Sequence, residues 1–153
     1  MKHPFTPRRI AFAGMIAALY AVVTLLLRPI SYGELQVRVS EALTLLPVLT
    51  PAAVPGLFVG CLIANVLGSA TIWDMVFGSL ATLAAALITR KLRHKPALAA
   101  LAPVVLNGVV VGSVLALTLN LPLLVTMLWV ALGEAIACYA LGLPLLWALK
   151  KLP

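Results

Sequence analysis

The stretch Ile10–Leu27, IAFAGMIAALYAVVTLLL, decides the fold class of this protein. It holds 18 residues without a charge, and Lys2, Arg8 and Arg9 precede it. A helix needs about 20 apolar residues to cross the hydrocarbon core of a bilayer. The apolar part of a secretory signal is shorter, about 7–15 residues, and no convincing cleavage site follows this stretch. We therefore expect it to be a first transmembrane helix.

The rest of the 153-residue chain has the same character. Hydrophobic residues make up 63% of it and charged residues only 10%, with a mean hydropathy of +1.15. Soluble domains carry about 25% charged residues, and a 16.1 kDa globule has too little interior for so many apolar side chains. The apolar runs are continuous, whereas the strands of outer-membrane barrels alternate. The composition predicts an all-α integral membrane protein, one transmembrane domain over residues 1–153.

Prolines and polar residues divide the chain into a compact bundle of six expected transmembrane helices. Turns are expected at Arg28-Pro29, at Thr50-Pro51 and at Asn120-Leu121-Pro122. Residues 30–39 form the longest polar stretch, which we expect to lie outside the bilayer core, and Pro144 is expected to kink the last helix. The expected helices cover residues 9–27, 40–49, 52–67, 73–89, 96–119 and 123–149.

The basic residues are distributed unevenly over the expected loops. With six spans both ends of the chain lie on one side, and that side holds nine of the 11 basic residues: Lys2, Arg8, Arg9, Arg90, Lys91, Arg93, Lys95, Lys150 and Lys151. The other side holds only Arg28 and Arg38. Cytoplasmic loops are enriched in Lys and Arg, so we expect both termini in the cytoplasm. A five-span arrangement separates the two basic ends and fits this rule less well.

Small residues recur at every fourth position in three of the expected helices. The seams are Ala13, Ala17 and Ala21, then Gly56, Gly60, Ala64 and Gly68, and then Gly108, Gly112 and Ala116. Such seams let helices approach closely in lipid, and most of them only hold a bundle together. The first helix also carries Gly14 and Ala18 on an adjoining face. We therefore expect one face of this helix to be free for another subunit.

Few acidic or carboxamide side chains fall within the expected helices. They are Glu41, Asn65, Asp74, Asn107 and Glu134. A charge at the centre of a bilayer costs about 2.5–3.5 kcal/mol on insertion scales, so such groups usually face the protein interior and mark a site. The alternative is structural. The amides and Glu134 then brace neighbouring helices, Asp74 caps its helix, and Glu41 pairs with Arg38 or stabilises a helix start.

The helix directions set the depth of these groups. Glu41 and Asp74 fall near the outer surface, and Asn65 lies slightly below them. Asn107 and Glu134 fall about halfway along neighbouring antiparallel helices, where we expect them to form the floor of an outward-facing pocket. Carboxylate and carboxamide groups complement the N–H donors and carbonyl of a guanine-like ligand. The candidate ligand-binding residues are Glu134, Asn107, Glu41, Asn65, Arg38 and Asp74.

Motifs for catalysis and metal binding are missing from the sequence. It has no GxxxxGK(S/T) phosphate loop, no HExxH and no plausible Ser/His/Asp set, and Cys61 and Cys138 are isolated in apolar runs. We expect neither an enzyme nor a cofactor or metal, and the chain cannot hydrolyse ATP by itself. Without an internal repeat, it is also small for a self-sufficient secondary transporter.

Four segments of the sequence resemble the QueT family. They are Val37–Leu43 (VRVSEAL), Pro55–Asn65 (PGLFVGCLIAN), Phe77–Leu83 (FGSLATL) and Ala131–Glu134 (ALGE). The resemblance extends over nearly the whole chain, about Arg8–Lys151. Members of this family are substrate-binding S components of energy-coupling factor (ECF) transporters, assigned to queuosine precursors.

The resemblance implies a multi-pass protein of the bacterial plasma membrane that binds a 7-deazaguanine, such as its aminomethyl form, from outside. The ammonium of that form would suit Glu41 or Glu134. The implied partners are a transmembrane T component, faced by Ala13, Ala17 and Ala21, and two cytoplasmic ATPases. Two alternatives stay open. One is an S component for another vitamin or small heterocycle, and the other is a membrane assembly protein that transports nothing.

Overall fold

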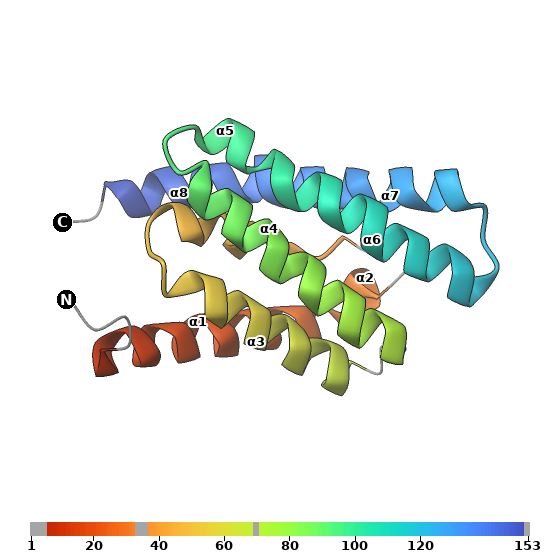
Figure 1. The fold of residues 1–153 in the computed structure, drawn as a ribbon, viewed down its shortest axis with the longest axis horizontal. Coiled ribbons are helices and arrows are strands. Elements are labelled where there is room, and N and C mark those ends of the chain that lie inside the picture. The colour runs from red at the N-terminus through yellow and green to blue at the C-terminus, as the bar shows by residue number, and fades with distance from the viewer. Residues whose placement is uncertain (1–5, 33–36, 69–70, 152–153) are drawn as a thin grey trace.

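The computed structural model describes residues 6–32, 37–68 and 71–151, and the chain is helical throughout these ranges (Figure 1). No strand occurs in this part of the chain, which confirms the expected all-α class. The elements in chain order are α1 Pro7–Leu26, α2 Arg28–Ser31, η1 Val39–Val48, α3 Ala53–Leu67, η2 Asp74–Gly78, α4 Ser79–Lys91, α5 Pro96–Ala99, α6 Leu101–Leu119, α7 Leu123–Ala135, η3 Ile136–Gly142 and α8 Leu143–Lys150.

Several of these elements form longer apolar helices. Among the described residues, the helical stretches Pro7–Leu26, Pro96–Leu119 and Leu123–Lys150 are long and apolar enough to cross a membrane. η1 and α3 are shorter and also apolar. Large hydrophobic side chains cover the outside, with Leu26 and Leu117 each 76% exposed. An apolar surface of this extent identifies a protein embedded in a membrane.

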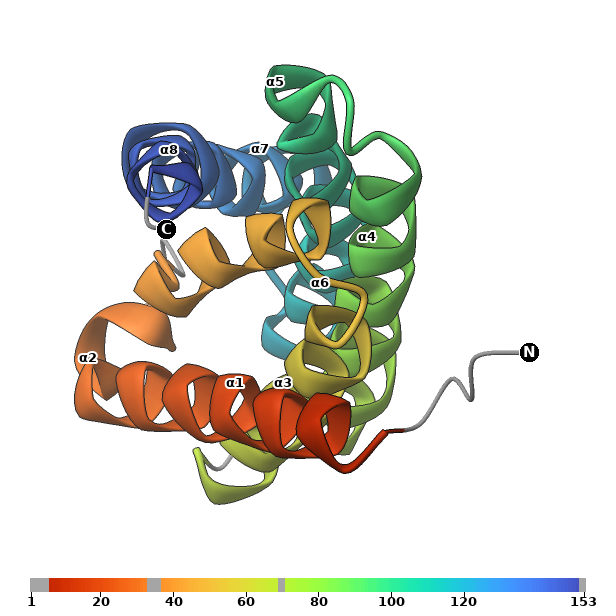
Figure 2. The same ribbon diagram turned by 90° about the vertical axis from the view of Figure 1, so that its left-hand side faces the viewer.

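The helices run antiparallel along one long axis. Figure 1 shows both described chain ends at the same end of the molecule, together with the turns after η1 and after α4. α2 and the turn between α6 and α7 lie at the opposite end. α1 packs along α3, and α6 packs along α7. Viewed end-on, η1 runs between α1 and α8 (Figure 2).

η1 is the central element of the bundle. It contacts α1, α3, α4, η3 and α8, and eight of its ten residues are buried. Its backbone is a 3₁₀ helix that contains Pro47 near its end. A 3₁₀ helix rises about 2.0 Å per residue rather than 1.5 Å, so a short segment reaches farther through the bundle. The chain thus places Glu41, in the first turn of η1, deep inside the protein, and the expectation that it lies near the outer surface is wrong.

The α1–α3 interface is built from small residues. A Cβ added to Gly56 would lie 2.7 Å from the carbonyl oxygen of Ala13, and one added to Gly60 would lie 2.8 Å from that of Ala17. Ala21 is buried in a hydrophobic cluster that also contains Leu57 and Cys61 of α3. The alanine seam of α1 therefore holds the bundle together.

We expect Gly60→Ala to destabilise the protein by about 1–3 kcal/mol, because overpacking a tight interface displaces backbone or side chains. Thermal unfolding of the purified protein in one detergent measures the effect. Gly14→Ala is the matched control, since a Cβ at Gly14 meets no atom within 4 Å. Equal melting temperatures for the two variants would show that the α1–α3 contact is not tight.

Two segments of the later helices are wound as π-helix. η3, Ile136–Gly142, comes immediately before α8, whose second residue is Pro144. Proline has no N–H for the carbonyl four residues earlier, and its ring crowds that turn. The wider turn of a π-helix accommodates the missing N–H and the proline ring. The sequence predicts a kink at Pro144, and the structure has a π-helical segment immediately before this residue. η2, Asp74–Gly78, is the second such segment and carries a candidate site residue.

Candidate functional site

The polar residues singled out in the sequence converge in the interior of the bundle. They come from five elements, η1, α3, η2, α6 and α7, and each is at most 4% exposed: Glu41, Asn65, Asp74, Asn107 and Glu134. Ionisable groups buried at membrane depth are costly to place there and usually mark a functional site. Their contacts divide them into an inner and an outer cluster.

The inner cluster consists of Tyr20, Glu41, Asn107 and Glu134. Asn107 Nδ2 donates to Glu134 Oε1 at 3.0 Å and lies 3.5 Å from Glu41 Oε2. The Tyr20 hydroxyl donates to Glu41 Oε1. Close packing of α6 on α7 permits the first contact, because a Cβ on Gly108 would lie 2.8 Å from Ala131 Cβ. Asn107 and Glu134 thus meet, as their positions along neighbouring antiparallel helices predict.

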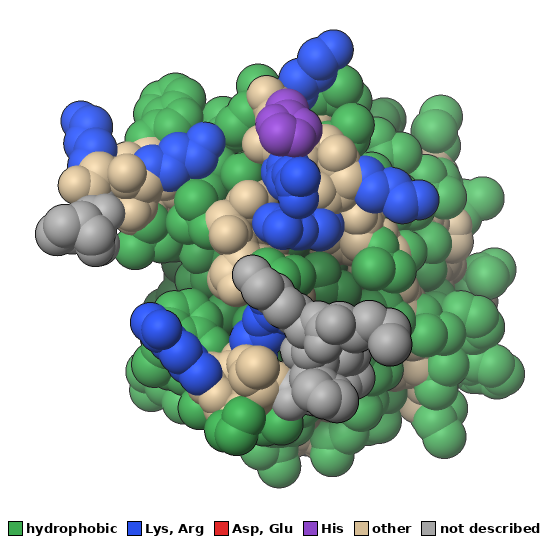
Figure 3. All heavy atoms as spheres, turned by 60° about the vertical axis from the view of Figure 1, so that its left-hand side comes forward, with side chains coloured by type: hydrophobic (Ala, Val, Ile, Leu, Met, Phe, Trp, Pro, Cys, Tyr) green, Lys and Arg blue, Asp and Glu red, His purple; other side chains and the backbone are tan. Residues whose placement is uncertain are grey.

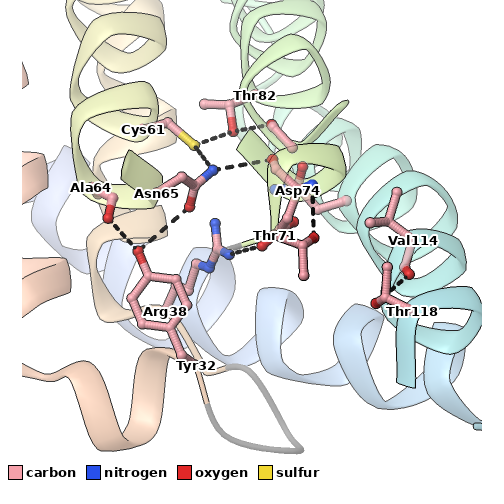
Figure 4. Close-up of polar contacts among 12 residues, drawn as sticks. Tyr32, Arg38, Cys61, Ala64, Asn65, Thr71, Asp74, Thr82, Val114 and Thr118 are labelled. Atoms are coloured by element: carbon pink, nitrogen blue, oxygen red, sulfur yellow. Dashed lines mark hydrogen bonds and ion pairs between the residues drawn. The ribbon is translucent and has the colours of Figure 1, made fainter. Parts of the chain in front are cut away.

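The outer cluster consists of Tyr32, Arg38, Asn65 and Asp74 (Figure 4). Arg38 Nη2 lies 3.3 Å from Asp74 Oδ2, and the Tyr32 ring stacks against the guanidinium, with its centroid 5.2 Å from Arg38 Cζ. The Tyr32 hydroxyl donates to the Ala64 carbonyl at 2.7 Å. Asn65 Nδ2 donates to the Asp74 carbonyl at 3.3 Å. These contacts tie α3, η2 and the segment before η1 together at one end of the bundle.

The sequence left open whether Glu41 pairs with Arg38 and whether the Asp74 side chain caps its helix. Arg38 forms its ion pair with Asp74, and the carboxylate of Glu41 meets Tyr20 and Asn107. The helix that contains η2 begins at Ile72, and Thr71 caps it, because its Oγ1 accepts a hydrogen bond from the Asp74 N–H at 3.2 Å. The Asp74 side chain is therefore available for Arg38.

The expectation that residues 30–39 form a loop is wrong at the two ends of this stretch, because Ile30 and Ser31 lie in α2 and Val39 begins η1. Ser31 is also buried. Arg38 is only 4% exposed, because its charge is neutralised by the buried carboxylate of Asp74. Residues 33–36 of this stretch lie outside the described ranges.

Three buried oxygen atoms of the two clusters lack a hydrogen-bond partner among the described residues. They are Asp74 Oδ1, Asn107 Oδ1 and Glu134 Oε2. A buried acceptor left unsatisfied costs about 1–3 kcal/mol, so each of these atoms calls for a donor. An amide oxygen accepts only, and so does an ionised carboxylate. The two clusters can therefore offer hydrogen-bond acceptors to a molecule with N–H groups.

Sequence reasoning missed two tyrosines of the site. Tyr20 is fully buried in α1, on the side that packs against α3, and Tyr32 follows α2. A buried tyrosine normally finds a partner for its hydroxyl, and this was the available signal for Tyr20. Ser40 and Thr24 add a further buried contact beside Glu41, a 2.6 Å bond between their hydroxyl oxygens.

Metal ligands do not gather in this interior. Within the described residues, no group of three or more His, Cys, Asp or Glu side chains is placed to hold a metal ion. The two cysteines, Cys61 and Cys138, are buried and not bonded to each other. The Cys61 sulfur accepts from Asn65 Nδ2 at 3.6 Å, and the Cys138 sulfur lies 3.6 Å from Thr44 Oγ1 of η1.

The fold and the buried acceptors define a helical membrane protein whose interior holds two clusters of polar side chains. Residues 10–151 match the sequence profile described as QueT transporter, and the chain belongs to this family. The assignment confirms the resemblance seen in the four segments and implies a transport protein.

One curated relative adds to this finding. Over 72 residues the chain is 39% identical to the queuosine precursor transporter QueT of Lactococcus lactis subsp. cremoris (strain MG1363). The match covers 46% of this chain and 42% of the relative, so it spans less than half of the relative's length. No solved structure shows significant similarity to this chain.

Proposed function

We propose that this protein is the substrate-binding component of an importer for a queuosine precursor, a 7-deazaguanine such as its aminomethyl form. Family membership and the name of the Lactococcus relative support a queuosine precursor as the solute. The single observation that carries the choice of ligand is the set of unpartnered buried acceptors Asp74 Oδ1, Asn107 Oδ1 and Glu134 Oε2.

A 7-deazaguanine offers what these acceptors lack. Its ring edge and exocyclic amine carry N–H donors, and the aminomethyl form adds an ammonium. Asn107 and Asp74 would accept from the ring edge, and the carboxylates of Glu134 and Glu41 would balance the cation. Arg38 and the Tyr32 ring provide a donor and an aromatic face at the outer cluster. Asn65 would act indirectly, since it holds the backbone of Asp74.

We further propose that six helical stretches cross the plasma membrane of a bacterium, with both termini in the cytoplasm. Basic side chains gather at the end of the molecule where both described chain ends lie, and no acidic side chain of the described residues shows on that face (Figure 3). Cytoplasmic surfaces are rich in Lys and Arg. The outer cluster at the opposite end then faces the exterior, where a nutrient enters.

Site-directed labelling tests this orientation. Leu121→Cys, in the turn between α6 and α7, is expected to react with a membrane-impermeant maleimide in intact cells, because Leu121 is 39% exposed. Arg93→Cys, in the turn after α4, is expected to react only after permeabilisation. The native cysteines are buried and give a low background. Labelling of Arg93→Cys in intact cells would contradict the proposed topology.

The proposed energising partners are an ECF transmembrane T component and two cytoplasmic ATPases, since this chain has no phosphate-binding loop of its own. α1 remains the proposed contact with the T component. Ala17 and Ala21 are buried within the bundle, whereas Ala11, Gly14 and Ala18 form an exposed small-residue face on the same helix. This face allows close approach of another helix in lipid.

Ala18→Trp is expected to release the T component during co-purification while affinity for the ligand persists. A large ring on the exposed face blocks close helix approach without entering the core. Ala140→Trp, an exposed site on η3, is the matched control and is expected to leave the complex intact. Unchanged co-purification of Ala18→Trp would remove this face of α1 from the interface.

Mass spectrometry of small molecules released from the purified protein tests the proposed function. The protein is made in cells that synthesise queuosine, washed, and denatured to release what it holds. A 7-deazaguanine enriched over an unrelated membrane protein is the expected result. Consistent release of a different heterocycle would reject the solute and retain the importer, whereas absence of any bound or bindable molecule would favour an assembly protein.

A further inference from the structure

An apolar groove lies at the basic end of the molecule, away from the polar clusters. Its volume is about 670 Å³, and it lies between α1, α3 and α4. Its wall and rim include Ile10, Phe58, Leu83, Leu87, Arg9 and Arg90. The volume is within the range of about 300–1,000 Å³ typical of sites for small ligands.

The charges of the groove are all of one sign. Arg9 and Arg90 are the ionisable residues of its lining, and no Asp or Glu lines it. Arg90 Nη1 donates to the carbonyls of Pro47 and Val48, at 2.9 and 3.3 Å, which fixes the guanidinium at the end of η1. These bonds leave Arg90 Nε and Nη2 without a hydrogen bond to the described part of the chain.

We propose that this groove binds an anionic phospholipid, with the headgroup phosphate between Arg9 and Arg90 and an acyl chain along Phe58, Leu83 and Leu87. A guanidinium matches the geometry of a phosphate and binds it with two parallel hydrogen bonds. Basic pockets between transmembrane helices on the cytoplasmic side bind anionic headgroups. A free phosphate would leave the apolar wall unoccupied, whereas a lipid fills both parts of the site.

The position of the groove suggests what the lipid does. It touches α1, α3 and α4, and Arg90 links it to the end of η1, the element that carries Glu41. A bound headgroup would therefore hold the basic ends of four elements together. The polar clusters are not part of the groove, so the proposed lipid and the proposed solute occupy separate sites.

Native mass spectrometry of the full chain tests the proposal. Phosphatidylglycerol and phosphatidylcholine with identical acyl chains are titrated onto delipidated protein. We expect phosphatidylglycerol to bind at least about tenfold more tightly, and Arg9→Gln/Arg90→Gln to abolish this preference, a difference of about 1.4 kcal/mol. Arg93→Gln/Lys95→Gln removes the same charge from the same end outside the groove, and is expected to retain the preference.

Loss of Arg90 could also destabilise the fold, because Arg90 bonds to the carbonyls of Pro47 and Val48. A second variant therefore tests the groove without removing Arg90. Leu83→Trp keeps both arginines and fills the apolar wall, and is expected to weaken binding of phosphatidylglycerol while the melting temperature in detergent stays within a few degrees. Equal affinity for the two lipids would overturn the proposal. So would an equal loss in the control variant, or displacement of the lipid by inorganic phosphate, which would indicate an anion site without a lipid.

Discussion

Glu134→Gln is expected to weaken binding of aminomethyl-7-deazaguanine by about 30-fold or more. Glu134 is 3% exposed, and one of its carboxylate oxygens has no partner among the described residues. Loss of a buried hydrogen-bonded charge pair costs about 2–5 kcal/mol of affinity, and about 1.4 kcal/mol corresponds to a factor of ten. The substitution keeps the shape of the side chain, and its amide oxygen still accepts from Asn107.

Isothermal titration calorimetry in one detergent measures this loss. Thr126→Val is the matched control on the same helix, since its hydroxyl only bonds back to the Pro122 carbonyl at 2.9 Å. The control is expected to keep full affinity. If Glu134→Gln also kept full affinity, Glu134 would be a brace between α6 and α7 rather than a ligand contact.

The second large effect is expected at the ion pair between Arg38 and Asp74. Both side chains are almost fully buried, at 4% and 5% exposure. Asp74→Asn leaves the guanidinium of Arg38 buried without its counter-charge, and breaking a buried pair in this way costs about 3–5 kcal/mol of stability. Unfolding of the purified protein by denaturant in mixed micelles measures the change.

The double variant Arg38→Gln/Asp74→Asn separates charge from packing. It removes both charges together, so we expect it to recover a substantial part of the stability lost in Asp74→Asn. If the single variant were as stable as the native protein, the pair would not determine the structure of the outer cluster. Its contribution would then be confined to the ligand.

The amino-acid composition and the positions of the prolines are enough to predict the helical class of this protein. The uncharged stretch after Arg9 and the turns at Pro51 and Pro122 depend on local chemistry, which the sequence displays directly. The contact between Asn107 and Glu134 was also predictable, because neighbouring antiparallel helices joined by a short turn place their midpoints together.

Other features depend on packing between distant segments and were not predictable. Tyr20 reaches Glu41 because the alanine face of α1 packs against α3. Gly56 and Gly60 of α3 permit this close packing, since neither has a Cβ. The resemblance assigned the face of Ala13, Ala17 and Ala21 to a partner subunit, whereas the structure packs this face of α1 against α3. The pair of Arg38 with Asp74, 36 positions apart, likewise depends on where the segment before η1 passes η2.

The 3₁₀ and π forms of some helices could not be predicted from the sequence for a different reason. The apolar residues of η1 fit an α-helical pattern as well as the 3₁₀ form observed, since a ten-residue segment is too short for its period to be resolved. The π-segments at Asp74 and at Ile136 change the backbone register by one residue within otherwise regular helices.

The central claim is that the buried acceptors of the two clusters form one binding site for a 7-deazaguanine. Equilibrium binding of aminomethyl-7-deazaguanine to the purified chain, measured by calorimetry without any partner subunit, tests it most directly. The account predicts saturable binding of one molecule per chain, lost in Glu134→Gln. A folded, monodisperse protein that shows no saturable binding of this compound would contradict it.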